Sequence, residues 1–262
     1  MIIIGELING MYKAVTKAIQ DRDTALIQHL AQDQVKAGAS ILDVNAGPFS
    51  KDPMADMKWL VETIQKVGDV SLSLDSARPD VIEECLKIAK KKAIINSTTA
   101  DIEKMERVFG LAVKYKSQVI GMAIDKSGVP DSRQKRVELA STIVAKAIDS
   151  GISVDDIYLD PVAMPINVAQ AQCIEVLQTI RDFAGICDPA PKVVIGLSNV
   201  SQGAKKRSLI NRTYLAMAMA NGLNAAILDP LDKELMDTMI AAELIANKNI
   251  YCDSFLEAYR KV

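Results

Sequence analysis

Eight short runs of apolar residues, most of them β-branched, alternate along the chain with segments of helical periodicity. The apolar runs are residues 2–4, 41–44, 70–74, 93–95, 119–124, 157–159, 193–197 and 225–228. The clearest helical segments are residues 54–68, 79–91, 101–116, 133–151 and 233–248. A continuous apolar run is typical of a parallel strand buried on both faces, whereas apolar residues at helical spacing indicate a covering helix. Eight such units predict a closed (β/α)8 barrel, the TIM barrel; an open doubly wound sheet is the main alternative.

Single residues also mark where the helices should begin and end. Side chains able to cap a first helical turn precede three segments, at Asp101, at Asp131 or Ser132, and at Ser208. Glycines stand where helices should end, at Gly38, Gly68, Gly151 and Gly222. No linker or low-complexity segment divides the 262 residues, and barrels of this size usually form one domain. We therefore expect a single domain over residues 1–262.

Composition and charge exclude several classes of function. The net charge is −2 at pH 7, so no overall positive field attracts nucleic acid or a membrane surface. The N-terminal apolar run, residues 1–4, is too short for a signal peptide or a spanning helix, which predicts a cytoplasmic protein. The chain has 4 scattered cysteines and one histidine, His29, so we expect no disulfide, no metal site and no histidine base.

Nearly all of the predicted strands end in polar side chains. The strand-end residues are Glu6, Asn9, Asp43, Asn45, Asp75, Asn96, Asp160, Ser198, Asn199 and Asp229. Any one of them could simply cap the next helix. In a barrel, however, the carboxyl ends of all strands meet at one mouth, where the active site lies. Carboxylates that accept, and amides that donate and accept, suit a neutral planar ligand rich in N–H groups, such as a pterin or a nucleobase.

Motifs spread over the whole chain resemble one family, in the same order. They are IIIGELINGM, ILDVNAGP, LSLDS, AIINSTTA, YLDPVAMPINVAQ, VIGLSNVSQ, RSLINRTYLAMAMANGLNAAI and, near the C-terminus, IYCDSF. This series is similar to the methyltetrahydrofolate:corrinoid/iron–sulfur protein methyltransferases, the pterin-binding methyltransferases of acetogenic bacteria. The wider family includes the folate-binding module of cobalamin-dependent methionine synthase and, more distantly, dihydropteroate synthase. All of these are pterin-binding (β/α)8 barrels.

The resemblance implies a reaction and a set of partners. It implies a homodimer that moves a methyl group between the N5 nitrogen of 5-methyltetrahydrofolate and the cobalt(I) of a corrinoid such as cobalamin. The chain has no Asp-x-His-x-x-Gly corrinoid motif, so the corrinoid is expected on a partner, a corrinoid protein such as the corrinoid/iron–sulfur protein. The alternative within the family is a methyltransferase of an O- or N-demethylation system, which carries methyl groups from a methylcorrinoid to tetrahydrofolate.

The resemblance also assigns roles residue by residue. Asp75, Asn96 and Asp160 would hold the pterin, and Asn199 would hydrogen-bond at or near N5. The same pocket would be lined by Gly196, Ser198, Gln202 and, at its rim, Arg207. Less defined roles fall to Glu6, Asn9, Asp43 and Asn45. Leu7 stands where the family commonly has arginine, so an ion pair made by that arginine is not expected here.

The uncharged amide at the end of the seventh strand suggests how methyl transfer is assisted. N5 must gain positive character before or during attack, because an amine that carries no positive charge is a poor leaving group. A positioned hydrogen-bond donor that strengthens as the charge at N5 changes does this without an unusual pKa. An amide carries a donor and an acceptor and can rotate to present either. We therefore expect Asn199 to be the catalytic residue.

Three other functions would use some of the same features. An enzyme similar to dihydropteroate synthase would need a basic anion-binding loop after the second strand, and the segment there, NAGPFSKDP, does not match one. A class I aldolase would need a lysine at a strand end inside the barrel; Lys126, the nearest candidate, falls in an expected loop. A non-catalytic folate-binding protein would keep the acids and amides but would show no methyl transfer.

Overall fold

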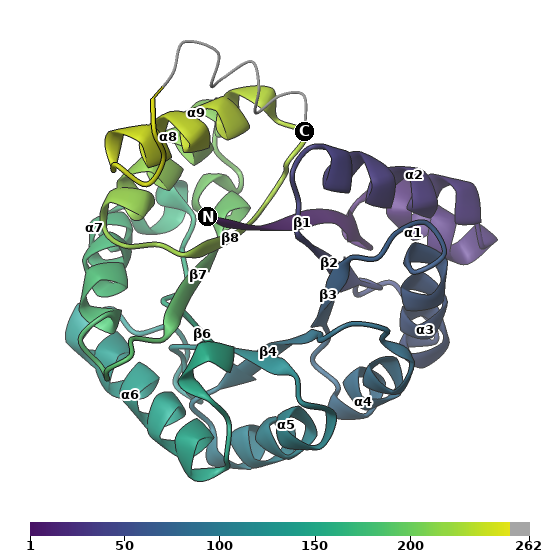
Figure 1. Cartoon of the computed structure of the whole chain (residues 1–262), viewed down its shortest axis with the longest axis horizontal. Coiled ribbons are helices and arrows are strands. Elements are labelled where there is room, and N and C mark those ends of the chain that lie inside the picture. Colours follow the sequence, from purple (N-terminus) through teal and green to yellow (C-terminus); the bar gives the residue numbers. More distant parts are fainter. Residues whose placement is uncertain (252–262) are drawn as a thin grey trace.

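The computed structural model describes residues 1–251, and its strands form a closed barrel (Figure 1). The strands pair in chain order, every pairing is parallel, and β8 pairs with β1 to close the ring. Their bounds are β1 (Ile2–Asn9), β2 (Ile41–Asn45), β3 (Ser71–Asp75), β4 (Ile94–Thr99), β5 (Gln118–Met122), β6 (Ile157–Asp160), β7 (Lys192–Gly196) and β8 (Ala225–Leu228). The predicted (β/α)8 barrel is confirmed, and the open-sheet alternative is wrong.

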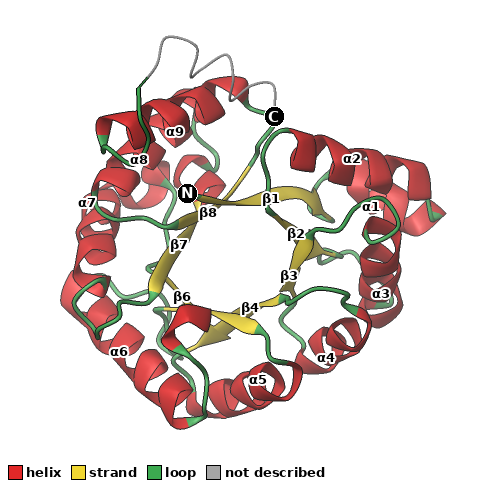
Figure 2. Cartoon of the chain, viewed as in Figure 1, coloured by secondary structure: helices red, strands yellow, loops and turns green. Residues whose placement is uncertain are grey.

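Helices surround the ring of strands on its outside (Figure 2). The α-helices are α1 (Lys13–Asp21), α2 (Thr24–Lys36), α3 (Pro53–Ile64), α4 (Pro79–Ile88), α5 (Ile102–Tyr115), α6 (Arg133–Asp149), α7 (Ile166–Phe183), α8 (Arg207–Ala220) and α9 (Lys233–Ile245). Two short 3-10 helices, η1 (Val154–Asp156) and η2 (Leu197–Ser201), precede β6 and follow β7. Within residues 1–251, no helix is both long and apolar enough to cross a lipid bilayer. Most of the IYCDSF motif, from Cys252 onward, lies outside the described residues.

Two of the predicted helix starts are confirmed, and one is wrong. Asp101 and Ser132 cap α5 and α6, because each side chain accepts a hydrogen bond from a backbone N–H of the first turn. Ser208 does not begin α8, which starts one residue earlier at Arg207. The Ser208 hydroxyl instead donates to the carboxylate of Asp232 (2.8 Å), the residue that caps α9. This contact lies too far apart in the chain to be read from a local pattern.

The inside of the barrel has two layers, because the side chains of a strand alternate between its two faces. The lower layer, here called the apolar floor, consists of Ile4, Ile41, Ile94, Ile120, Tyr158, Val194 and Ala225. Burial of a large apolar side chain contributes about 1.5–3 kcal/mol, so the apolar floor both fills and stabilises the barrel. The inward positions two residues further along these strands are Glu6, Asp43, Asn96, Met122, Asp160, Gly196 and Ile227. Four of the polar strand-end residues, Glu6, Asp43, Asn96 and Asp160, therefore face the mouth directly over the apolar floor.

β1 and β5 are two of the strands whose lengths differ from the prediction. The first apolar run ends at Ile4, whereas β1 continues to Asn9, since the inward position of Glu6 lies at the mouth and tolerates a charged side chain. The fifth run was expected to reach Ile124, whereas β5 ends at Met122. In both cases the strand boundary depends on pairing with neighbours, which an apolar pattern does not record.

Candidate active site at the barrel mouth

Asp43 is the most buried acid of the mouth. Its Oδ1 accepts hydrogen bonds from the Ser73 hydroxyl (2.6 Å) and from Nδ2 of Asn96 (3.0 Å). Burial, together with the negative charge of Asp75, raises the pKa of Asp43 to about 7. Asp43 is 4% exposed, so its hydrogen bonds orient Asn96 from beneath rather than face solvent.

Asp75 lies beside Asn96 in the pairing of β3 with β4 and is oriented by Asn45. Nδ2 of Asn45 donates to Oδ2 of Asp75 (2.6 Å), while Oδ1 of Asn45 accepts from the Gly47 N–H (2.6 Å). Burial raises the pKa of Asp75; the Asn45 hydrogen bond and the positive charge of Lys104 oppose that rise. Four predicted residues thus form a connected group across three neighbouring strands: Asp43, Asn45, Asp75 and Asn96.

Asp160 stands apart from that group, at the end of β6. Its Oδ1 accepts a hydrogen bond from the Val162 N–H (2.7 Å), and no group of residues 1–251 hydrogen-bonds to its other carboxylate oxygen. Burial raises the pKa of Asp160 to about 7, although the Val162 hydrogen bond opposes the rise. The carboxyl group therefore keeps one acceptor available to a ligand in the mouth.

Glu6 and Arg207 hold the η2 turn from opposite sides. The Ser198 hydroxyl donates to Oε1 of Glu6 (2.7 Å) on β1. From α8, Nη2 of Arg207 donates to the Ser198 carbonyl (3.3 Å), and its Nε donates to the Ser201 hydroxyl (3.1 Å). Burial raises the pKa of Glu6, and the Ser198 hydrogen bond opposes that rise. The Arg207 guanidinium, predicted at the rim of the pocket, is thus engaged with the turn itself.

Asn199 differs from the acids because it is exposed and its amide has no hydrogen-bond partner within residues 1–251. Gly196 makes room for this side chain: a Cβ at Gly196 would lie 2.9 Å from Nδ2 of Asn199. Gln202, at the end of η2, is also exposed. Asn9 accepts a hydrogen bond from the Met11 N–H (2.9 Å) and so shapes the loop after β1. The turn after β7 therefore presents an uncommitted amide beside the ring of acids.

The mouth is rich in hydrogen-bond acceptors. Acidic side chains with raised pKa values come from five strands or their ends: Glu6, Asp43, Asp75, Asp160 and Asp229. Such groups bind N–H donors well, since a buried carboxylate gains more from a donor than it would in water. Within residues 1–251, no cluster of histidine, cysteine and acidic side chains could hold a metal ion.

Two residues considered for other chemistry lie elsewhere. Lys126 has an exposed side chain, and its Nζ lies 2.9 Å from Oδ2 of Asp101, so it is not the barrel lysine that an aldolase needs. His29 is exposed on α2, where it lies 3.0 Å from Asp33. Neither side chain reaches the barrel mouth.

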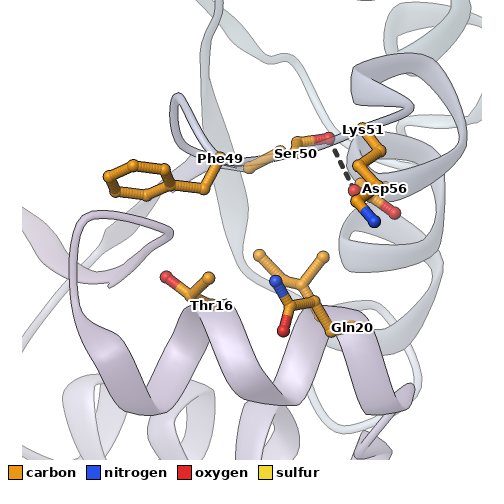
Figure 3. A pocket seen from close by; sticks show the side chains of 8 residues that line it. Thr16, Gln20, Phe49, Ser50, Lys51 and Asp56 are labelled. Carbon is orange, nitrogen blue, oxygen red and sulfur yellow. Dashed lines mark hydrogen bonds between the residues drawn. The ribbon is translucent and has the colours of Figure 1, made fainter.

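A separate cavity of about 400 Å³ lies between α1 and the loop after β2 (Figure 3). Thr16 and Gln20 line it from α1, and Phe49 and Lys51 from the loop. None of the predicted site residues lines this cavity. The cavity and the ring of acids are therefore distinct features of the same protein.

Some residues of the mouth were missed by sequence reasoning. Ser73 could have been found, because it stands two residues before Asp75 and so shares its strand face. Tyr12, whose hydroxyl lies 3.4 Å from Oε1 of Glu6, gave no signal, since it belongs to the loop after β1. Val162 likewise acts through its backbone N–H, which side-chain patterns do not report.

A closed parallel barrel with acids and amides at its carboxyl mouth belongs to the class of barrels that bind a small polar ligand over their strand ends. The chain belongs to the pterin-binding enzymes, because the family model described as "Pterin binding enzyme" matches residues 11–229. The matched range contains every predicted site residue except Glu6 and Asn9. The family resemblance read from the motifs is confirmed.

Individual relatives are similar over most of the chain. It is 28% identical to a methylcorrinoid:tetrahydrofolate methyltransferase of Eubacterium limosum, covering 100% of this chain and 97% of the relative. It is 25% identical over 87% of its length to a methionine synthase of Mycobacterium tuberculosis, but spans only 20% of that protein. A solved dihydropteroate synthase from Coxiella burnetii, in complex with pteroic acid, superimposes with a TM-score of 0.71 at 17% identity, covering 95% of this chain and 94% of that one. The likeness to the synthase shows a shared fold.

Proposed function

We propose that this protein is a methyltransferase that moves a methyl group between N5 of 5-methyltetrahydrofolate and the cobalt(I) of a corrinoid held by a partner protein. The observation that carries the proposal is the pairing, at one mouth, of oriented pterin acceptors with the uncommitted amide of Asn199. Membership of the pterin-binding family supports the ligand. Similarity along the full chain to a methylcorrinoid:tetrahydrofolate methyltransferase supports the reaction.

The pterin would be held by its amino-amide edge. Asp75 and Asp160 offer carboxylate oxygens to the ring N–H groups, and Asn96 offers both a donor and an acceptor. Asn45 and the Val162 N–H already fix the two carboxylates, so little side-chain freedom remains to be lost on binding. A fixed pterin also lowers the entropic cost of bringing its N5 methyl group to a second large molecule.

Asn199 would act at N5. When bound on its own protein, the corrinoid supplies a cobalt(I) nucleophile that takes the methyl group. The amide of Asn199 can donate to N5 and strengthen that hydrogen bond as the charge on N5 changes. Ser198 and Arg207 keep the turn in place while the amide itself stays free to rotate. Transition-state stabilisation of this kind needs no proton donor with a perturbed pKa.

The partner would be a corrinoid protein, with the corrinoid/iron–sulfur protein as one candidate. We further propose that the protein is a cytoplasmic homodimer in which one domain, residues 1–262, carries the whole site. An open mouth over the strand ends is compatible with a second protein approaching the bound folate.

The opposite direction is the second candidate. The name of the Eubacterium limosum relative favours methyl transfer from a methylcorrinoid to tetrahydrofolate, as in an O- or N-demethylation system. Because a catalyst accelerates both directions, the same residues serve either one. The identity of the corrinoid protein decides which direction operates in the cell.

Methyl transfer from 5-methyltetrahydrofolate to free cobalt(I) cobalamin, followed by absorbance, tests the proposal. Wild type should turn over, and Asn199→Ala should be slower by about 10²–10³-fold while folate binding changes little. Gln134→Ala, which removes an exposed amide on α6, is the matched control and should match wild type. Activity of Asn199→Ala within about twofold of wild type would contradict the assigned role.

Further assays with the same protein samples distinguish the remaining candidate functions. Tight folate binding by wild type without any methyl transfer would favour a non-catalytic folate-binding protein. Dihydropteroate synthase activity would favour the function that the structural neighbour's name states. Methyl transfer with the corrinoid protein of an O- or N-demethylation system, and not with the corrinoid/iron–sulfur protein, would support the demethylation alternative.

A further inference from the structure

Arg136 is a completely buried cation that contacts no carboxylate within residues 1–251. It lies in the first turns of α6, at 0% exposure. Its Nε donates to the Pro161 carbonyl (2.9 Å), its Nη2 donates to Oε1 of Gln172 (2.8 Å), and its Nη1 has no partner. Burial lowers the pKa of Arg136. Because a buried charge that no carboxylate contacts lowers stability, a function for this guanidinium has to be sought.

The loop that Arg136 holds follows directly after Asp160. Val162, the second residue of that loop, has a φ of 67°, in the left-handed region that a β-branched residue rarely adopts. This conformation costs free energy and persists only where the surroundings impose it. In return, the Val162 N–H points at the Asp160 carboxylate and donates to its Oδ1 (2.7 Å).

Arg136 is well placed to impose that conformation. It binds the Pro161 carbonyl, which belongs to the peptide unit immediately before Val162. Gln172 of α7 fixes the guanidinium from the other side, and its own Nε2 donates to the Asp131 carbonyl (2.9 Å). The loop carbonyl is thus connected to two helices through one buried side chain.

We propose that Arg136 is a positioning residue of the pterin site: by holding the Pro161 carbonyl, it keeps Val162 left-handed and so keeps the Asp160 carboxylate oriented toward the mouth. One oxygen of Asp160 is thereby occupied by the Val162 N–H, and the other is left for the ligand. The inference rests on the proposed function only in taking Asp160 as a pterin ligand.

The pH dependence of folate binding separates a positioning role of Arg136 from simple packing, because only the positioning role links Arg136 to the ionisation of Asp160. Tyr214 of α8 interacts electrostatically with Asp160 and with Cys173 of α7, and burial raises the pKa of both Tyr214 and Cys173. Glu175 and Asp131 attract the Arg136 cation, whereas the pKa of Asp160 is set by burial and by the Val162 hydrogen bond. Near neutral pH, Asp160 is therefore the group of this loop whose ionisation changes.

The affinity for tetrahydrofolate, measured by calorimetry across neutral pH, tests the proposal. Arg136→Met should weaken binding about tenfold, the usual effect of misplacing one charged hydrogen bond. It should also move the pH midpoint of binding upward, because loss of the Val162 N–H removes the contact that lowers the pKa of Asp160. Arg133→Met, on the same helix but partly exposed and paired with Asp182, should change neither quantity.

A second substitution tests the link through Val162. Glycine adopts a positive φ without strain and keeps the backbone N–H, so Val162→Gly should make the conformation of this loop independent of Arg136. For the same reason, the double variant Arg136→Met, Val162→Gly should recover most of the lost affinity. Arg136→Lys, which keeps one donor for the Pro161 carbonyl, should fall between wild type and Arg136→Met, and it replaces Arg136→Met if that variant does not fold.

The outcomes separate this inference from the proposed function. No folate binding by wild type would overturn both. Arg136→Met could bind folate with the affinity and pH midpoint of wild type and differ only in a lower melting temperature. That result would show that Arg136 serves only in helix packing. A folded double variant that binds as weakly as Arg136→Met would refute the role of Val162, and recovery of binding would support it.

Discussion

Replacement of Asp160 by asparagine should stabilise the folded protein while damaging its site. In the empty barrel, burial raises the pKa of Asp160 from 3.8 to about 7. Between these two values the folded state holds a proton that the unfolded state has released. Stability therefore falls as the pH rises through this range, at about 1.36 kcal/mol per pH unit.

The size of the effect follows from the width of that range. Three pH units at this slope amount to about 4 kcal/mol, and partial contact of the carboxyl group with solvent reduces the expected value to about 2–4 kcal/mol. An asparagine at position 160 keeps an oxygen for the Val162 N–H but never ionises. The stabilisation of Asp160→Asn over wild type should accordingly be small near pH 4 and largest above pH 7.

Urea unfolding of wild type and Asp160→Asn, at about pH 5 and about pH 8, measures this difference. Asp80→Asn is the control, since Asp80 is exposed and its hydrogen bond with Arg78 lowers its pKa. The free energy of unfolding of Asp80→Asn relative to wild type should not increase as the pH rises. If the advantage of Asp160→Asn were the same at both pH values, burial would not be penalising the Asp160 carboxylate, and the reasoning would be refuted. The same variant should bind tetrahydrofolate less well, by calorimetry.

Two further predictions concern the η2 turn and the loops at the mouth. Ser198→Ala removes the donor to Glu6 and releases one side of the turn, so kcat should fall about tenfold while KM for the folate stays within about twofold; a change in KM alone would assign Ser198 to binding. Gly10→Ala should lower the free energy of unfolding by about 1–3 kcal/mol, because its Cβ would overlap the Ala46 carbonyl oxygen. Gly110→Ala, in open space on α5, should instead stabilise by about 0.5–1 kcal/mol; equal urea midpoints for the two variants would contradict the close approach of the loops.

The strands could be located from sequence because buried parallel strands are apolar without interruption. Val193–Ile195, for example, needs no tertiary information to be recognised, and the polar residues after each run follow from where the strands end. The length of β1 could not be read, since Glu6 and Asn9 continue the strand with polar side chains. An apolar pattern reports burial in an apolar core, whereas the end of β1 lies among polar side chains at the mouth.

Motifs in the sequence located many residues of the candidate site, but they did not show which of these residues contact one another. Asp75, Asn96 and Asp160 could be named from motifs, but the contacts that orient them join strands far apart in the chain. Arg136 was invisible, because arginine within a helical pattern is normally assigned to the surface. Arg207 was expected to face a ligand, whereas its guanidinium also finds acceptors in the neighbouring turn, a contact that depends on the folded loop.

The two layers inside the barrel separate the positions that face a ligand from the positions that fill the core. Along every strand except β3, one inward residue belongs to the apolar floor and the inward residue two places later belongs to the mouth. A change at the second position alters what is recognised without opening a void beneath it. A library that randomises only the mouth positions should retain folded barrels with new ligand preferences. This separation offers a physical reason why barrels as distant as 17% in sequence identity keep one backbone plan.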